Sequence, residues 1–228
     1  MFTDRREAGR QLAERLKGLA GTPAVVLALP RGGVPVAAEI AQALGLPLDL
    51  MLVRKVGLPG HRELALAAVA GPEGADMAVN REVAAEAGYT DAEIEALAAP
   101  ERAEIRRRRE LYLAGRAPAE VKGRTAVLVD DGIATGATVR AALQALRRMG
   151  PARIVLAVPV AAGDTIEALQ GEADEVVCLD TPPLFYAVGA HYADFSQVSD
   201  DEVTRILAET AGRAAMSRRG DGPGAGGP

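Results

Sequence analysis

The chain has 228 residues, of which 49% are hydrophobic and 25% are charged, and its formal net charge at pH 7 is −5. This length allows one large domain or two small ones, with enough apolar residues for a sizeable core. The acidic balance argues against a nucleic-acid-binding protein, which usually has a basic balance or a basic stripe. Cys178 is the only cysteine, which excludes an internal disulfide and a cysteine-cluster metal site.

The sequence also lacks the usual membrane signals. Its longest apolar run is far shorter than a membrane span, and the charged N-terminal segment has no apolar stretch like that of a signal peptide. We therefore expect a soluble, cytoplasmic protein that binds neither membranes nor nucleic acids.

Helical and strand patterns alternate along most of the chain. Continuous apolar runs bounded by turn residues predict buried strands at residues 24–29, 48–53, 125–129, 153–160 and 175–179. Apolar residues at helical spacing predict helices at residues 4–19, 34–45, 137–149, 164–170 and 200–212. This alternation favours a single α/β domain over residues 1–212, with a parallel twisted sheet and helices on both faces.

Two segments depart from this pattern. Residues 80–116 are rich in Ala, Glu and Arg, and they predict a helical insertion of two helices that separate near Gly88, with a break or a new start at Pro100. The insertion either covers the site or forms a homodimer, and the sequence leaves both open. The glycine-rich end, residues 213–228, is predicted to be disordered.

The insertion contains the run Arg106–Arg109, which invites a nucleic-acid hypothesis. Four consecutive helical residues point in four directions, so they cannot form one basic stripe. Glu104 can pair with Arg108 four residues later. We therefore interpret this run as part of a solvated helix.

Ligands of open parallel sheets bind beyond the carboxyl ends of the strands, so the segments that follow strands are the ones to inspect. We predict loops at residues 30–35, 54–63, 130–138 and 180–198, the last forming a small hood.

The segment VLVDDGIATGATV, residues 127–139, has the most specific pattern. Asp130 and Asp131 follow an apolar run and can accept hydrogen bonds from hydroxyl groups. Gly136 lets the backbone approach a ligand, and the helix that starts near Ala137 directs free N–H groups and its positive dipole end into the loop. A phosphate next to a vicinal diol fits this pattern, as in ribose 5-phosphate. The alternative is an ordinary strand–turn–helix whose acids cap the helix.

Other phosphate loops fit less well, because a Walker loop requires lysine where Ala137 stands and the dinucleotide fingerprint is absent. The segment instead resembles the phosphoribosyl-pyrophosphate (PRPP) motif of the type I phosphoribosyltransferases. The resemblance implies that Asp130 and Asp131 hold the ribose hydroxyls. It also implies that the 5-phosphate is held by Ile133, Ala134, Thr135, Gly136, Ala137 and Thr138. The resemblance extends over roughly residues 23–70 and 122–200.

The loop after the first strand, LPRGGVPVA, contains Arg31, Gly32 and Gly33. In the family this loop binds pyrophosphate and often has a non-proline cis peptide, and its arginine and two glycines match in kind. A plain strand-to-helix turn remains the alternative. After the second strand the family has a mobile loop with basic residues, which implies catalytic roles for Arg54 and Lys55, with Lys55 the best candidate for contact with the leaving group.

The resemblance implies a pentosyltransferase of nucleotide metabolism that transfers 5-phosphoribosyl from PRPP to a nitrogenous, base-like acceptor and releases pyrophosphate. We expect Mg²⁺, because the highly anionic pyrophosphate leaving group requires a hard cation, held by phosphate oxygens and water. Asp130 and Asp131 would act on the metal only through ribose hydroxyls or water. The alternative is a non-catalytic regulatory module that senses PRPP. The retained segment Arg31–Gly33 and the pair Arg54–Lys55 favour turnover.

The acceptor is not identified by the resemblance, since the chain is also similar to bacterial proteins known only as predicted phosphoribosyltransferases. Phe185 and Tyr186 follow the last strand and are candidates to stack on a flat base, although a small aromatic core is equally consistent. Relatives that use 6-oxopurines have an aspartate at the position of Ala134. We therefore predict that hypoxanthine and guanine are poor acceptors.

Overall fold

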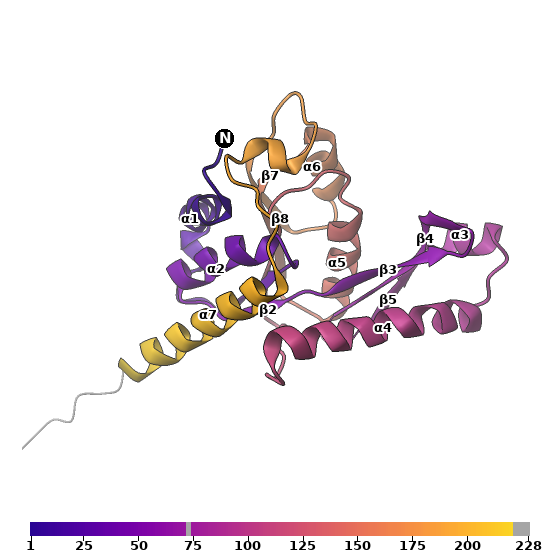
Figure 1. Cartoon of the computed structure of the whole chain (residues 1–228), viewed down its shortest axis with the longest axis horizontal. Helices are drawn as coiled ribbons and strands as arrows, with labels where there is room; N and C mark the ends of the chain where they lie inside the picture. Colours follow the sequence, from indigo (N-terminus) through magenta and orange to yellow (C-terminus); the bar gives the residue numbers. More distant parts are fainter. Residues whose placement is uncertain (72–73, 221–228) are drawn as a thin grey trace, which may run out of the picture.

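The computed structural model describes residues 1–71 and 74–220 of the chain. Its main sheet has five parallel strands in the order β2-β1-β6-β7-β8 (Figure 1). These strands are β2 (Leu48–Leu50), β1 (Ala24–Ala28), β6 (Thr125–Val129), β7 (Arg153–Val160) and β8 (Glu175–Asp180). The predicted α/β class is confirmed. Ala28 pairs with Val129, so β1 and β6 end side by side and deliver their loops to one place.

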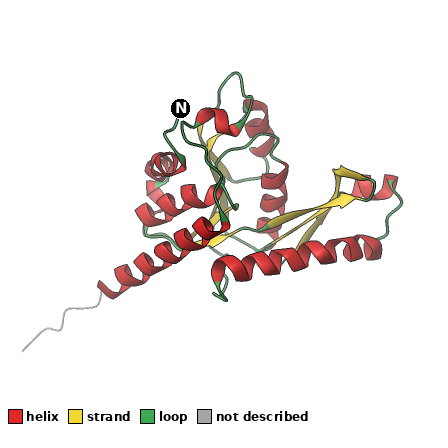
Figure 2. Ribbon diagram, in the orientation of Figure 1, coloured by secondary structure: helices red, strands yellow, loops and turns green. Residues whose placement is uncertain are grey.

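Helices cover both faces of this sheet (Figure 2). Val127 and Val129 pack toward α1 (Arg5–Arg15) and α2 (Gly33–Leu44), whereas Leu128 packs toward α5 (Ala137–Arg148) and α6 (Gly163–Leu169). Successive strand residues point to opposite faces, so strands covered on both sides must be apolar throughout. This is why these strands have continuous apolar sequences.

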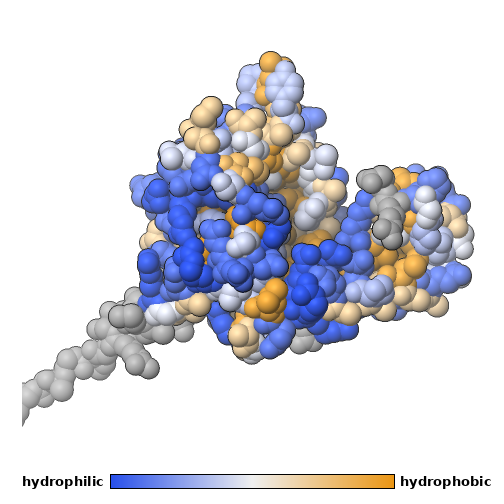
Figure 3. Space-filling view, viewed as in Figure 1, coloured by the Kyte–Doolittle hydropathy of each residue, from blue (hydrophilic) through white to orange (hydrophobic). Residues whose placement is uncertain are grey.

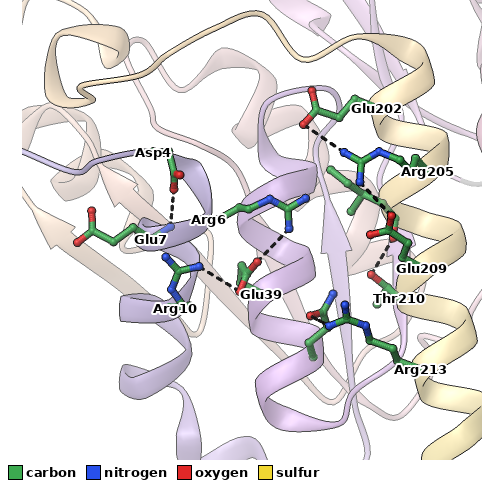
Figure 4. A network of polar contacts seen from close by, with 12 residues as sticks. Asp4, Arg6, Glu7, Arg10, Glu39, Glu202, Arg205, Glu209, Thr210 and Arg213 are labelled. Carbon is green, nitrogen blue, oxygen red and sulfur yellow. Dashed lines mark hydrogen bonds and ion pairs between the residues drawn. The ribbon is translucent and has the colours of Figure 1, made fainter.

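The last helix, α7 (Asp200–Gly220), packs against α2. Arg213 of α7 donates to Gln42 of α2, and Arg6 of α1 donates to Glu39 of α2 at 3.0 Å, so polar contacts join all three helices (Figure 4). The prediction of disorder from residue 213 is wrong as far as Gly220, because this alanine- and arginine-rich stretch favours helix and continues α7. The rest of the predicted tail, 221–228, lies outside the described residues.

A second, three-stranded antiparallel sheet extends away from the main sheet (Figure 1). It consists of β3 (Val53–Leu58), β4 (His61–Ala70) and β5 (Asp76–Val79). The prediction of a loop at 54–63 is therefore wrong, since only Pro59 and Gly60 form a turn. Val56 and Leu58 are buried on one side of β3 while Lys55 is exposed, so the segment has the alternation of a half-buried strand.

The predicted helical insertion is found as α3 (Arg81–Glu86) and α4 (Asp91–Leu113). A capping box between Thr90 and Glu93 begins α4. The predicted break at Pro100 is wrong, because Pro100 lies on the exposed side of α4 while Ile94 and Ile105 anchor the opposite side. We refer to β3–β5, α3 and α4, residues 53–113, as the arm.

The four consecutive arginines of α4 lie in different environments, as the helical geometry predicts. Arg106 and Arg107 are exposed, and Arg108 is half-buried and pairs with Glu104 at 2.8 Å, as predicted. The interpretation as a solvated helix is wrong for Arg109, which is buried with its Nη1 3.4 Å from Asp49 Oδ1 on β2. This contact holds the end of the arm against the edge of the main sheet.

Within residues 1–71 and 74–220, no helix combines the length and the apolar character that crossing a bilayer requires.

Candidate functional site

The loop between β6 and α5 is held from behind by the neighbouring strand and helix. Ile133 donates its N–H to Val160 at 2.9 Å, and Thr165 of α6 donates its hydroxyl to the carbonyl of Ala134 at 2.7 Å. Gly136 has a φ of 73°, and a Cβ there would lie 2.9 Å from a methyl carbon of Thr165, so glycine is required.

The outer side of this loop is open to solvent. The exposed residues of the loop and of the first turn of α5 are Ala134, Thr135, Ala137 and Thr138. The first N–H groups of a helix have no partner inside the helix, so those at the start of α5 can bind an anion in front of the loop. The predicted phosphate loop thus has an exposed outer side next to the start of α5.

Asp130 and Asp131 are half-buried at the base of this loop. The Oδ2 atom of Asp131 accepts a hydrogen bond from Arg5 Nε of α1 at 2.7 Å, and the hydroxyl of Tyr192 donates to the Asp131 carbonyl at 2.5 Å. The Arg5 guanidinium also lies over the ring of Phe195, 3.8 Å from its centroid. Arg5 and Tyr192 are site residues that no local sequence pattern indicates, since they lie far from Asp131 in the chain.

Burial disfavours the charged forms of these two carboxylates. Burial, together with the charge of Asp131, raises the pKa of Asp130 well above its usual value. Burial also raises the pKa of Asp131, although the hydrogen bond and the charge of Arg5 oppose that rise. Hydroxyl donors from a ligand would stabilise the charged form of both groups.

The loop after β1 lies directly beside the two acids. Its peptide bond between Pro30 and Arg31 is cis, the conformation common in the family that the sequence resembles. A Cβ on Gly32 would lie 1.9 Å from Asp131 Oδ2, and one on Gly33 would lie 2.6 Å from the Val129 carbonyl oxygen. A side chain at position 33 would collide with main chain, and one at position 32 would displace the Asp131 carboxylate or the loop. The guanidinium of Arg31 is directed toward α7, with Nη1 3.7 Å from Asp200 Oδ1.

Arg54 and Lys55 reach the site from the arm. Arg54 Nε pairs with Glu101 Oε2 of α4 at 2.7 Å. Lys55 lines a cleft of about 590 Å³ between the arm and α5, and Ala137 and Thr138 of the phosphate loop line the same cleft. The space-filling view shows the arm standing apart from the main body on this side (Figure 3). Lys55 and the end of the predicted phosphate loop thus face the same cleft.

The two candidate acceptor residues differ in their surroundings. Tyr186 is 85% exposed, whereas Phe185 is half-buried and stacks on His191 with ring centroids 5.5 Å apart. Phe185 also packs against the small cluster that contains Phe2 and Tyr192. Tyr186 thus offers an open ring, while Phe185 is engaged in packing. Cys178 of β8 packs against the hydrophobic core, and burial raises the pKa of its thiol.

Comparisons with known proteins found matches over most of the chain. A family model described as "Phosphoribosyl transferase domain" matches residues 4–193. A Mycobacterium tuberculosis protein that carries the provisional name phosphoribosyl transferase is 49% identical over 207 residues, 91% of this chain and 46% of that protein. The chain thus spans about half the length of this relative.

Two further proteins show how far the similarity reaches. The crystal structure of TT1426 from Thermus thermophilus superposes with a TM-score of 0.80 at 49% identity, covering 92% of this chain and 98% of that one. A ribose-phosphate pyrophosphokinase of Xylella fastidiosa is 36% identical over 100 residues, 42% of this chain and 30% of the enzyme. The part of the chain left uncovered is much smaller than the arm, so the TT1426 match includes most of the arm.

Proposed function

The chain belongs to the phosphoribosyl transferase domain family, and we propose that it transfers the 5-phosphoribosyl group of PRPP to a nitrogenous, base-like acceptor, with release of pyrophosphate. One observation carries this proposal. The open phosphate loop, the acid pair and the Gly32–Gly33 segment meet where β1 and β6 end side by side. A phosphate, a vicinal diol and a diphosphate on one ribose match these three features in turn.

In this proposal the 5-phosphate binds in front of Ile133–Thr138, where the N–H groups of the first turn of α5 point outward. The ribose hydroxyls donate to Asp130 and Asp131. These bonds favour the charged carboxylates, whose burial otherwise disfavours them. Binding the sugar at both ends fixes its anomeric carbon relative to the protein, which is the positioning part of catalysis.

The leaving diphosphate binds against the backbone of Gly32 and Gly33, with Arg31, Arg54 and Lys55 as the cationic groups. As the bond between the anomeric carbon and the diphosphate oxygen breaks, negative charge accumulates on the diphosphate and positive charge on the ribose ring. Fixed cations at the diphosphate lower the energy of that transition state. The lone pair of the acceptor nitrogen forms the new bond to the anomeric carbon, and the proton of that nitrogen is released to the departing diphosphate or to water.

We propose Mg²⁺ as the cofactor. Among the residues that the structure describes, no group of three or more His, Cys, Asp or Glu side chains could hold a metal ion. The half-buried pair Asp130–Asp131 fits a cation bound mainly by ligand oxygens and water, with the acids acting through ribose hydroxyls or water. The ion supplies charge neutralisation of the diphosphate.

For the acceptor we propose a flat base that stacks on the exposed ring of Tyr186. Phe185 would hold this segment in place by packing against the cluster that contains Phe2 and Tyr192. Ala134 stands where 6-oxopurine-specific relatives have an acid, and an alanine can neither accept nor donate the proton of the base. Hypoxanthine and guanine are therefore expected to release little pyrophosphate, and efficient turnover of either would contradict this part of the proposal.

The first experiment is calorimetry with ribose 5-phosphate and with PRPP in the presence of Mg²⁺. The double variant Asp130→Asn, Asp131→Asn is expected to weaken ribose 5-phosphate binding at least about 100-fold, because it removes two charged hydrogen-bond acceptors. The matched control is Glu167→Gln on α6, an exposed acid, which should bind like the wild type. Unchanged affinity in the double variant would refute the site. A screen of bases for pyrophosphate release then tests turnover.

A further inference from the structure

One face of α4 is directed at the candidate site. Glu101, Ile105, Arg108 and Tyr112 follow one another at spacings of three or four residues, so they lie on one side of the helix. Ile105 and Tyr112 are buried, and Glu101 binds Arg54. Arg108 lies between the two buried residues, so its side chain leaves α4 on the side that faces the ends of the central strands.

Arg108 reaches the two ligand loops. It lines a narrow crevice with Leu29 and Pro30 of the predicted pyrophosphate loop, Arg54 of β3 and Thr138 of the phosphate loop. The crevice holds only about 30 Å³, room for roughly one water molecule. A diphosphate would therefore lie at the mouth of the crevice, where these side chains end.

Arginines from three separate elements meet around Pro30, and each has an acidic partner. Arg108 pairs with Glu104 at 2.8 Å, Arg54 with Glu101 at 2.7 Å, and Arg31 lies 3.7 Å from Asp200. Burial raises the pKa of Tyr112 to about 12, helped by Asp200, and the charges of Arg108 and Arg31 both oppose that rise. The Tyr112 hydroxyl donates to Asp200 Oδ1 at 2.6 Å, and the same oxygen lies 3.7 Å from Arg31 Nη1. Tyr112 and Arg108 are four residues apart on one side of α4, so Arg31 and Arg108 approach this hydroxyl and its acid from two elements.

We propose that Arg108, supplied by the arm, is a further diphosphate-binding residue, which exchanges Glu104 for phosphate oxygens when PRPP binds. This inference rests on the proposed function. A guanidinium presents a planar pair of N–H donors that fits two phosphate oxygens as well as it fits a carboxylate. Before PRPP arrives, the carboxylates hold the guanidinium groups apart and in place, which limits the repulsion among three like charges.

The chain offers a matched control at the next residue. Arg107 donates to the same acid, Glu104, at 2.7 Å, but its side chain is 62% exposed and it is not among the described residues that line the crevice. Arg107→Gln and Arg108→Gln thus remove the same charge and the same acidic partner. They differ in access to the diphosphate.

The test compares two affinities for each variant, measured by calorimetry with Mg²⁺. The affinity for ribose 5-phosphate measures binding by the phosphate loop and the acid pair. The ratio of the PRPP affinity to the ribose 5-phosphate affinity measures what the diphosphate adds to binding. In Arg108→Gln the ratio should fall by about tenfold to a hundredfold, as expected for a lost charge-assisted hydrogen bond, with ribose 5-phosphate affinity unchanged. In Arg107→Gln the ratio should stay at the wild-type value.

A second variant acts in the opposite direction. Glu104→Gln removes the carboxylate that competes for Arg108, so the ratio of PRPP affinity to ribose 5-phosphate affinity should rise. If Arg108→Gln does not fold, this variant alone tests whether Arg108 binds the diphosphate. Equal ratios in the wild type, Glu104→Gln and Arg108→Gln, with ribose 5-phosphate bound normally, would overturn the inference alone. Failure of the wild type to bind ribose 5-phosphate would overturn the proposed function and this inference with it.

Discussion

Arg5 and Asp131 are 126 residues apart in the sequence, and their Nε and Oδ2 atoms are 2.7 Å apart in the fold. Their side chains are only 11% and 14% exposed, so water contributes little to solvating either charge. The first helix of the chain thus holds one of the two acids on which the proposed sugar site depends.

Arg5→Met should leave the Asp131 carboxylate without its cationic partner in a mostly buried position. We expect the free energy of unfolding to fall by about 3 kcal/mol, as measured by urea denaturation. The control is Arg10→Met on the same helix, where Arg10 is 58% exposed and lies 3.5 Å from Glu39. That variant should lose less than about 1 kcal/mol. Equal losses in the two variants would show that Arg5 has no special role.

Gly32→Ala tests the close approach between the first loop and the acid pair. The new Cβ would lie 1.9 Å from Asp131 Oδ2, so the carboxylate or the loop must move. We expect the dissociation constant for ribose 5-phosphate to rise at least about tenfold, equivalent to the loss of one hydrogen bond to the charged Asp131. Gly163→Ala is the matched control, because a Cβ there meets nothing within 4 Å. Wild-type affinity in Gly32→Ala would contradict the geometry of this contact.

Replacing a buried and an exposed arginine of the run Arg106–Arg109 compares the effect of burial on stability, since each replacement removes the same charge. Arg109→Met leaves Asp49 buried and without its cation, so the free energy of unfolding should fall by about 3 kcal/mol or more. Arg106→Met changes an exposed side chain one turn away and should stay within about 0.5 kcal/mol of the wild type. Both values come from urea denaturation, and similar losses would argue against the buried pair.

Asp130 should lower stability at neutral pH, since burial raises its pKa above the value in the unfolded chain. Between the unfolded pKa of about 3.9 and the higher folded pKa, the folded state binds more protons than the unfolded state. The contribution of Asp130 to the free energy of unfolding therefore falls as the pH rises through this range. Asp130→Asn should therefore raise the free energy of unfolding at pH 7, with the gain shrinking as the pH falls toward about 4. A variant less stable than the wild type at pH 7 would contradict this direction.

The sequence predicted the main sheet and the loop at 130–138 because their signals are local. Continuous apolar runs identify strands that are buried on both faces, and the acids, glycines and threonines of the loop lie within nine residues of one another. Asp130, Asp131, Gly32 and Gly33 accordingly lie together in the structure.

The arm and the contacts of the acid pair could not be predicted in the same way. Segment 54–63 contains two glycines and a proline, and these turn signals masked the alternation of Val56 and Leu58 that makes β3 a strand. Pro100 predicts a break or a new start of a helix, but packing along the opposite side of α4 maintains the helix through it. Arg5, Arg108 and Tyr192 reach the site through tertiary contacts, which leave no trace in nearby sequence.

The strand conformation of β3 changes how Lys55 can approach a ligand. Lys55 pairs with Ala68 in the antiparallel ladder, so it cannot swing in on a freely moving loop. Any movement of its main chain must therefore carry β4 with it, while Arg109 joins the arm to Asp49 of β2. Two paired strands displace more solvent than a short loop, so turnover that depends on such a movement should slow as glycerol or sucrose raises the viscosity of the solution.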